Sequence, residues 1–140
     1  MDELFRIADE SKISIEYERL PLNESISAQI EGACFVIMDH ALTGNSASAR
    51  VHLAHEIGHC ITGSFYNPRA RLDVRQKHEN TAEKWAIEHT ITVDELDDAI
   101  ASGFCEYWQL AERFGVTEDF VKKTVCWYTY GNLAVDQYLL

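Results

Sequence analysis

Apolar residues in the first part of the chain follow two patterns that predict a small β-sheet. Ile13, Ile15 and Tyr17 alternate with polar neighbours, which is typical of a strand with one buried face. The run 33–38 is continuously apolar and precedes Asp39, as expected of a buried strand. The segments that we expect to form strands are 12–17, 27–31 and 33–38.

The period of the pattern then changes to that of helices. Between positions 51 and 61, Leu53, Ile57 and Ile61 recur every four residues and so share one face of a helix. Thr92 and Glu95 have the spacing of a capping box, which predicts a further helix start. The other helices are expected at about 79–86, 92–102, 107–114 and 117–127. Strands followed by helices predict an α+β fold, in which a small twisted N-terminal sheet precedes the helices.

Length and composition fit one compact domain spanning 1–140, with the helices at about 92–130 packed on the preceding part. The 140 residues are 46% hydrophobic, which suffices for a single core. No stretch approaches the roughly 18 uninterrupted apolar residues of a membrane span, and the start Met1–Glu3 lacks the basic residues of a signal peptide. We therefore expect a cytoplasmic protein that does not contact a membrane.

The four cysteines show no Cys-x-x-Cys pairing. They are Cys34, Cys60, Cys105 and Cys126. In a reducing compartment, cysteines with such spacing are free core thiols more often than disulfides, and we expect free thiols here. Cys60 directly follows a histidine of the motif described next, and we expect it to pack in the core.

The main cluster of metal-ligand residues is His55-Glu56-Ile57-Gly58-His59. Histidines four residues apart on a helix lie about 40° apart around its axis, so both imidazoles can bind one ion. Glu56 lies beside that face, where it can take a proton from zinc-bound water. An accidental cluster is the alternative, but the histidines face away from the apolar stripe of the helix, which favours a metal site. Gly58 inside a helix indicates a close backbone approach or space for substrate.

A catalytic zinc ion has three protein ligands and an open position for water, so one more ligand is needed. The candidates downstream are Asp73, His78, Glu79 and Glu83. Glu79 is preferred because Ala82 and Ala86 lie on or near its helix face, and small residues there permit close packing against the histidine helix. Glu83, one turn further on, is the rival, and its alternative role is that of a surface carboxylate.

Two segments resemble the ImmA/IrrE family of zinc metallo-endopeptidases, which occur on mobile elements and in bacterial stress regulators. The run Arg50–His59 is similar to the family's arginine, aromatic or aliphatic residue, and Leu-Ala-His-Glu-Leu-Gly-His. Glu79, followed by Ala82, Trp85 and Ala86, is similar to the family's Glu-x-x-Ala-x-x-Phe-Ala helix.

This resemblance, which covers roughly residues 13–91, implies a minimal gluzincin-like fold and one zinc ion per chain. The residues to which it gives roles are His55, His59 and Glu79 as ligands, with Glu56 as the general base. The chain departs from the family in having His52 where a threonine is common, and Ile91–Val93 where a proline often follows the second helix. Neither departure falls on a ligand position, so both bear on substrate specificity.

The family resemblance implies site-specific cleavage of a helix-turn-helix transcriptional repressor of a phage or mobile element. The alternative is a non-hydrolytic zinc-containing module that binds a repressor or a toxin–antitoxin partner, and a fourth protein ligand such as His78 or Cys60 would favour it. The net charge of −11 argues against direct nucleic-acid binding by the C-terminal helices and is compatible with a basic protein substrate. The sequence does not specify an oligomeric state.

Two features of the site stay open at this point. The side chain that stabilises the oxyanion cannot be ranked among Tyr66, His52, His78 and His40. A basic segment between the two metal-binding helices contains Arg69, Arg71, Arg75 and Lys77. We interpret it as a loop that is either simply solvated or lies at the rim of the cleft, where it would contact an acidic substrate segment.

Overall fold

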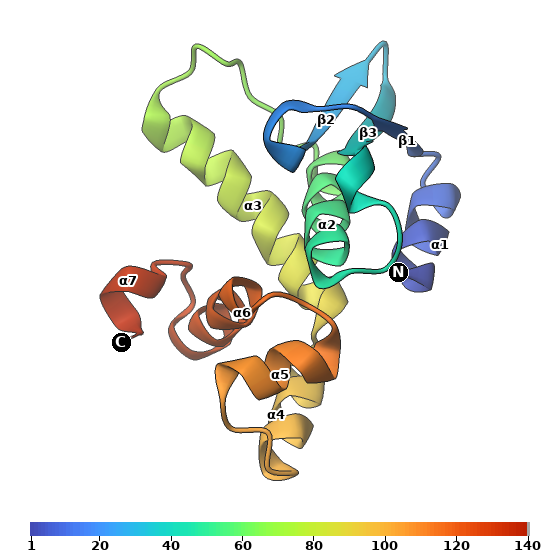
Figure 1. The fold of residues 1–140 in the computed structure, drawn as a ribbon. Helices are drawn as coiled ribbons and strands as arrows, with labels where there is room; N and C mark the ends of the chain where they lie inside the picture. Colours follow the sequence, from blue (N-terminus) through green and yellow to red (C-terminus); the bar gives the residue numbers. More distant parts are fainter. Residues whose placement is uncertain (140) are drawn as a thin grey trace. The chain divides into compact units, whose positions relative to one another are not determined.

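A three-stranded sheet forms the first layer of the fold. The computed structural model describes residues 1–139, so Leu140, the last residue of the predicted domain, lies outside them. The strands are β1 (Ser14–Glu18), β2 (Ser25–Ile30) and β3 (Ala33–Asp39), close to the expected segments (Figure 1). β3 is central, parallel to β1 and antiparallel to β2, so β2 is an edge strand.

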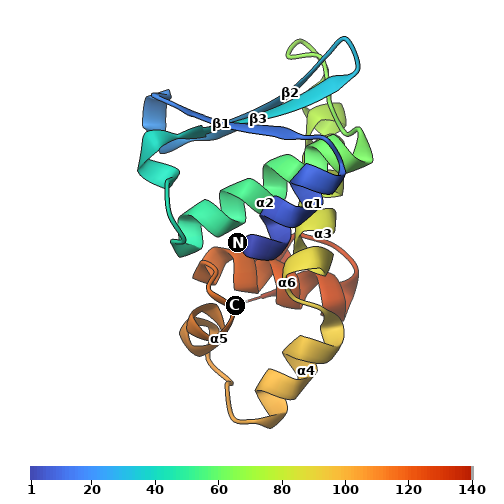
Figure 2. The same ribbon diagram turned by 90° about the vertical axis from the view of Figure 1, so that its right-hand side faces the viewer.

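Helices α1 (Asp2–Glu10) and α2 (Ala47–Thr62) lie on one side of this sheet (Figure 2). α2 contacts β2 and β3, and α1 packs beside α2. α1 lies outside the expected elements because its buried face consists of Leu4 and Ala8 alone, which is too short a repeat to stand out in the sequence.

Asp39, the last residue of β3, fastens the sheet to its flanking turns. Its carboxylate accepts backbone N–H bonds from Leu20 (2.6 Å) and Ala41 (2.8 Å) and thereby caps the short 3₁₀ helix η2 (His40–Leu42). The N–H groups of Ala41 and Leu20 hold the pKa of Asp39 below its usual value. A second 3₁₀ helix, η1 (Pro21–Asn23), leads into β2.

α2 carries the histidine motif and is capped at both ends. The Ser46 side chain accepts a 3.1 Å bond from an N–H group of the first turn, and Gly63 ends the helix with φ at +66°. Leu53 and Ile57 are fully buried, as the apolar stripe predicts. Ile61 is 40% exposed, so the stripe ends one turn earlier than the pattern indicates.

α3 (Leu72–Thr90) packs against α2 with the two backbones nearly in contact. A Cβ atom added to Gly58 would lie 2.5 Å from the carbonyl oxygen of Ala82, which is too close for any other residue without a shift. This confirms the expectation that Gly58 and Ala82 permit a close approach. α3 begins well before position 79, so Arg75 and Lys77 lie on a helix and the interpretation of the basic segment as a loop was wrong for them.

The first three helices of the C-terminal part agree with the expected ones, the third of them ends later than expected, and a short fourth helix was not expected. They are α4 (Val93–Ala101), α5 (Tyr107–Phe114), α6 (Glu118–Tyr130) and α7 (Val135–Tyr138). The capping box at the start of α4 is present, with Thr92 and Glu95 bonded reciprocally at 3.2 Å. Phe120 and Val121 are among the buried core residues of this part.

The chain divides into two compact units, Met1–Ala86 and Ile87–Leu140. The first holds the sheet and the histidine motif, and the second holds α4 to α7, which together give the expected α+β fold. Packing of the C-terminal helices on the first unit as one domain stays a prediction. No helix within residues 1–139 combines the length and apolar character of a membrane span.

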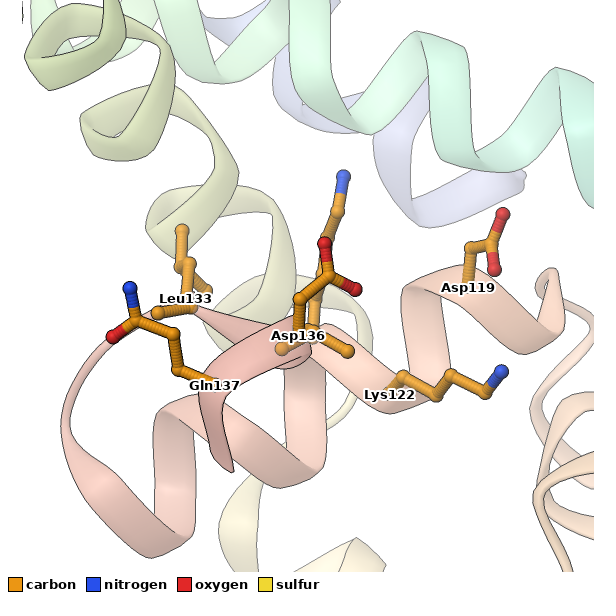
Figure 3. Close-up of a pocket in the computed structure, with 8 residues that line it drawn as sticks. Asp119, Lys122, Leu133, Asp136 and Gln137 are labelled. Carbon is orange, nitrogen blue, oxygen red and sulfur yellow. The ribbon is translucent and has the colours of Figure 1, made fainter. Parts of the chain in front are cut away.

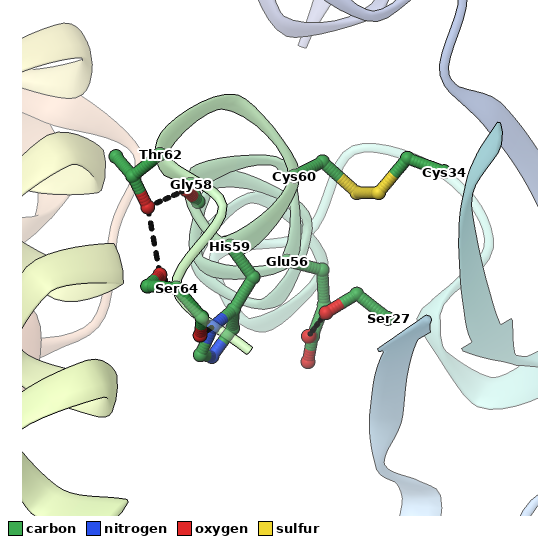
Figure 4. The surroundings of a disulfide bond; sticks show 8 residues. All are labelled: Ser27, Cys34, Glu56, Gly58, His59, Cys60, Thr62 and Ser64. Carbon is green, nitrogen blue, oxygen red and sulfur yellow. Dashed lines mark hydrogen bonds between the residues drawn. A yellow bond between two sulfur atoms is a disulfide. The ribbon is translucent and has the colours of Figure 1, made fainter. Parts of the chain in front are cut away.

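The expectation of free thiols at all four cysteines was wrong. Cys34 of β3 and Cys60 of α2, 26 residues apart in sequence, form a disulfide between the sheet and the histidine helix (Figure 4). Cys105 and Cys126 are free, the first exposed and the second buried. Cys60 therefore has a covalent role in addition to packing.

Candidate metal centre

Three side chains from α2 and α3 converge on one point. The Oε2 atom of Glu79 lies 2.7 Å from Nε2 of His55 and 3.1 Å from Nε2 of His59. The two Nε2 atoms are 3.2 Å apart, and all the ligand atoms lie within 4.8 Å of one another. Within residues 1–139 this is the group of histidine, cysteine and carboxylate residues whose spacing could hold a metal ion.

The far sides of both imidazoles face oxygen atoms, and for His59 the contact fixes the tautomer. Nδ1 of His59 lies 2.6 Å from the carbonyl oxygen of Ser64, which can only accept, so this nitrogen carries the proton. Nδ1 of His55 faces Oε2 of Glu83 at 3.3 Å. Nε2 of neutral His59 then presents a lone pair, and with Nε2 of His55 in the same tautomer three converging acceptors would fit a bound cation.

Electrostatics in the cluster point the same way. Burial lowers the pKa of His55, but the carboxylates of Glu79 and Glu83 outweigh burial and raise this pKa to about 10. Hydrogen bonds with His55 and His59 hold the pKa of Glu79 well below its usual value. The cluster therefore favours a positive charge at its centre, which a proton or a metal ion can supply.

The remaining ligand candidates are not part of the converging group. Glu83 is only 8% exposed and contacts the far nitrogen of His55, so the interpretation as a surface carboxylate was wrong, and it is not part of the converging group. Asp73 is exposed at the start of α3 and pairs with Arg71. His78 stacks on Tyr66 with ring centroids 6.1 Å apart.

Glu56 is buried beside the converging group without belonging to it. Its carboxylate accepts hydrogen bonds from Ser25 (2.7 Å) and Ser27 (2.8 Å), both on β2. The motif suggests a general base at this position, and the carboxylate is held in place by the sheet. The two serines carry no signal in the sequence, because their contact depends on how the strand lies over the helix.

The candidates for stabilising the oxyanion differ in how near they lie to the converging group. The Tyr66 hydroxyl donates a 2.8 Å bond to Oε1 of Glu79, and this bond raises the pKa of Tyr66. His52 contacts Ser25 instead, at 2.8 Å. His40 is exposed in η2. Tyr66 is thus the candidate donor nearest the converging group.

A cavity of about 490 Å³ opens over the cluster. It is lined by Ser25, Ile26, Ser27, His55, Glu56, His59, Ser64, Phe65, Tyr66, Pro68 and Glu79. Its walls therefore combine the edge strand β2, the histidine helix and the segment that follows it. Among the described residues that line it, none belongs to the basic segment at 69–77, so its position at the rim stays a prediction.

A second cavity, of about 450 Å³, lies in the C-terminal unit beside α6 and α7 (Figure 3). Lys122 and Asp119 line it together with Asp136 of α7. Its described walls hold charges of both signs, and the possible metal-binding group found within residues 1–139 lies at the first cavity instead.

Comparison with known proteins agrees with this geometry. The family model of the IrrE N-terminal-like domain, a family of peptidases, matches residues 44–125, which is more than half of the chain. The match includes every member of the converging group and Glu56. No curated protein matches the chain.

Proposed function

Because the chain belongs to the IrrE N-terminal-like family of metal-dependent peptidases, we propose that it is a zinc-dependent endopeptidase. The observation that carries the proposal is the convergence of both Nε2 atoms and the Glu79 carboxylate within 3.2 Å, next to a separate buried glutamate and an open cavity. Two histidines and one carboxylate with an open position are a typical catalytic zinc set. His55, His59 and Glu79 would hold one ion per chain.

A zinc ion held there would acidify a water molecule and polarise the scissile carbonyl group. The protein's own part falls to Glu56 and Tyr66. The Glu56 carboxylate accepts a proton from the attacking water and passes it to the leaving amine, which is general base and then general acid catalysis. Its position off the converging group keeps it available for this role.

The Tyr66 hydroxyl is the proposed donor to the developing oxyanion. It lines the cavity and lies 2.8 Å from Oε1 of Glu79, so a modest rotation can direct its proton toward a substrate carbonyl at the site. His78 stacks on the Tyr66 ring and thereby limits the ring positions.

The proposed substrate is a helix-turn-helix repressor of a phage or mobile element, cleaved in the cytoplasm at one site. The support is the family membership together with the net charge of −11, which suits a basic protein better than nucleic acid. The edge strand β2 borders the cavity, and an extended peptide could pair with its free edge. A non-hydrolytic module is disfavoured because neither His78 nor Cys60 joins the group as a fourth ligand.

Zinc content tests the site without knowledge of the substrate. We expect about one zinc ion per chain in the purified protein and a loss of zinc in His55→Ala and Glu79→Ala. Asp73→Asn, which removes an exposed carboxylate from the same helix, is the matched control and should keep zinc. A chain that neither contains zinc nor takes it up would overturn the assignment.

Glu56→Gln separates chemistry from binding. This variant should retain zinc but fail to cleave a panel of helix-turn-helix repressors, with products followed by mass spectrometry. Undiminished cleavage by Glu56→Gln would refute the assignment of Glu56 as the general base. A zinc-bound wild-type chain that binds a repressor without cleaving it would favour the binding module.

A further inference from the structure

We propose that Ser25 and Ser27 are positioning residues that hold Glu56 in the orientation needed for catalysis, and that His52 fixes the direction of the Ser25 hydroxyl. This inference rests on the proposed function for its catalytic consequence. The arrangement itself is a matter of geometry and can be tested without a substrate.

The two serines hold the carboxylate from one side, one oxygen each. Ser25 Oγ lies 2.7 Å from Oε2 of Glu56, and Ser27 Oγ lies 2.8 Å from Oε1. Alternate residues of a strand project to the same face, so β2 presents both hydroxyls to α2 at once. Figure 4 shows the Ser27 side chain reaching from the strand to Glu56. Two bonds in different directions fix the plane of a carboxylate, which one bond cannot do.

The donor and the acceptor in each of these hydrogen bonds follow from the chemistry of the groups. An ionised carboxylate can only accept, so the Ser25 hydroxyl must donate to Glu56. The Ser25 oxygen is then free to accept, and Nδ1 of His52, at 2.8 Å, is the donor. His52 must therefore carry its proton on Nδ1, and the chain of donors runs from His52 through Ser25 to Glu56.

The pair of serines leaves Glu56 able to react. Each carboxylate oxygen has about two lone-pair positions, and each serine occupies one. An acceptor position remains for the proton of an attacking water. Ser25 and Ser27 also line the cavity, so the strand that would receive a peptide is the strand that orients the base.

The His52 tautomer provides the first test. Long-range proton–nitrogen NMR spectra, recorded at a pH at which the imidazole is neutral, should show His52 with its proton on Nδ1, assigned by the signal that His52→Gln removes. Ser25→Ala should move His52 toward the Nε2 form, whereas Ser25→Thr, which keeps the hydroxyl, should not. An Nε2-protonated His52 in the wild type, or no response to Ser25→Ala, would overturn the arrangement.

Kinetics provide the second test, on any substrate that the wild type cleaves. Ser25→Ala and Ser27→Ala should each lower kcat by roughly 10-fold, and the double variant should lower it further. The loss in the double variant should not exceed the roughly 100- to 10,000-fold that general base catalysis contributes. KM and zinc content should stay near wild type, and Ser25→Thr and Ser27→Thr, which keep the hydroxyl, should recover most of kcat. Ser14→Ala, an exposed serine of β1, is the matched control and should behave as wild type.

The outcomes distinguish this inference from the proposed function. If the wild type cleaves nothing, the endopeptidase proposal fails while the tautomer result still decides the His52–Ser25–Glu56 arrangement. If the wild type is active and the Ala variants keep full kcat, the serines merely fasten β2 to α2 and the positioning role is refuted. If the Ala variants lose folded protein, the tautomer of His52 in the wild type decides the arrangement: a proton on Nδ1 supports it, and a proton on Nε2 overturns it.

Discussion

Nδ1 of His55 lies 3.3 Å from Oε2 of Glu83, on the side of the imidazole ring opposite the Nε2 atom that meets Glu79. Both glutamates come from α3, one turn apart, so a single helix supplies a carboxylate to each nitrogen of this histidine. A carboxylate behind a ligating histidine fixes the ring orientation and raises the basicity of the ligand nitrogen.

Glu83→Gln should therefore weaken zinc binding by roughly 10- to 100-fold without abolishing it, because the three ligands remain. Competition against a chelator of known affinity measures the change. Asp73→Asn on the same helix should leave the affinity unchanged. An unchanged affinity in Glu83→Gln would mean that Ser64, His59 and the packing of the helices suffice to orient the site.

Gly58→Ala should destabilise the protein by about 1–3 kcal/mol, because the new methyl group overlaps the Ala82 carbonyl oxygen. In an unhindered helix the same change would stabilise by about 0.5–1 kcal/mol, so the sign of the effect is decisive. Urea unfolding measures it. Zinc affinity should fall in parallel, since α3 has to move away from α2.

Cys60→Ser, or reduction of the Cys34–Cys60 disulfide, should lower the free energy of unfolding by about 3.5 kcal/mol, the loop-closure effect for a separation of 26 residues. Denaturation with and without a reductant measures the difference. Cys105→Ser, at an exposed free thiol, should change neither curve. Four free thiols in the non-reduced protein, counted by mass spectrometry after alkylation, would contradict the pairing.

Tyr66→Phe should lower kcat by roughly 100-fold or more if the hydroxyl stabilises the oxyanion, with little change in KM. The bond to Glu79 is lost as well, so zinc content has to be measured beside activity. Normal zinc content with normal kcat would remove Tyr66 from the mechanism.

Asp39 makes the stability of the N-terminal unit depend on pH. Its pKa is lower in the folded than in the unfolded chain because of the Ala41 and Leu20 N–H groups. A lowered pKa stabilises the fold above the unfolded value of about 4, and this contribution is lost as the pH falls through the folded pKa. Asp39→Ala should thus be less stable than wild type at pH 7, and the gap should narrow below about pH 4. Unfolding of the metal-free protein over this range tests the sign.

The parts of the site that the sequence could predict are those that depend on local periodicity. His55 and His59 share a helix face because of their spacing alone, independently of the rest of the fold. Glu79 could be selected because Ala82 and Ala86, on or near its helix face, indicate close helix packing. The match of the family model confirms the resemblance that these segments suggest. The strands and most helices follow for the same reason.

The parts that could not be predicted depend on contacts between distant elements. Cys34 and Cys60 meet because β3 lies over α2, and no spacing in the sequence encodes that distance. Ser25 and Ser27 reach Glu56 only in one position of β2 over the helix. Glu83 looked like a surface carboxylate because its burial is decided by the partner helix and not by its own neighbours.

The close approach of α2 and α3 at Gly58 and Ala82 determines how near Glu79 lies to the two histidines. Glu79 lies one turn before Ala82 on α3, so a residue larger than glycine at position 58, which would press on the Ala82 carbonyl group, would also move Glu79 away from the histidines. In this arrangement the Glu79 side chain spans the distance between the helices, and its Oε2 atom lies 2.7 Å and 3.1 Å from the Nε2 atoms of His55 and His59. The position of the Glu79 carboxylate beside the two histidines thus depends on a glycine of another helix.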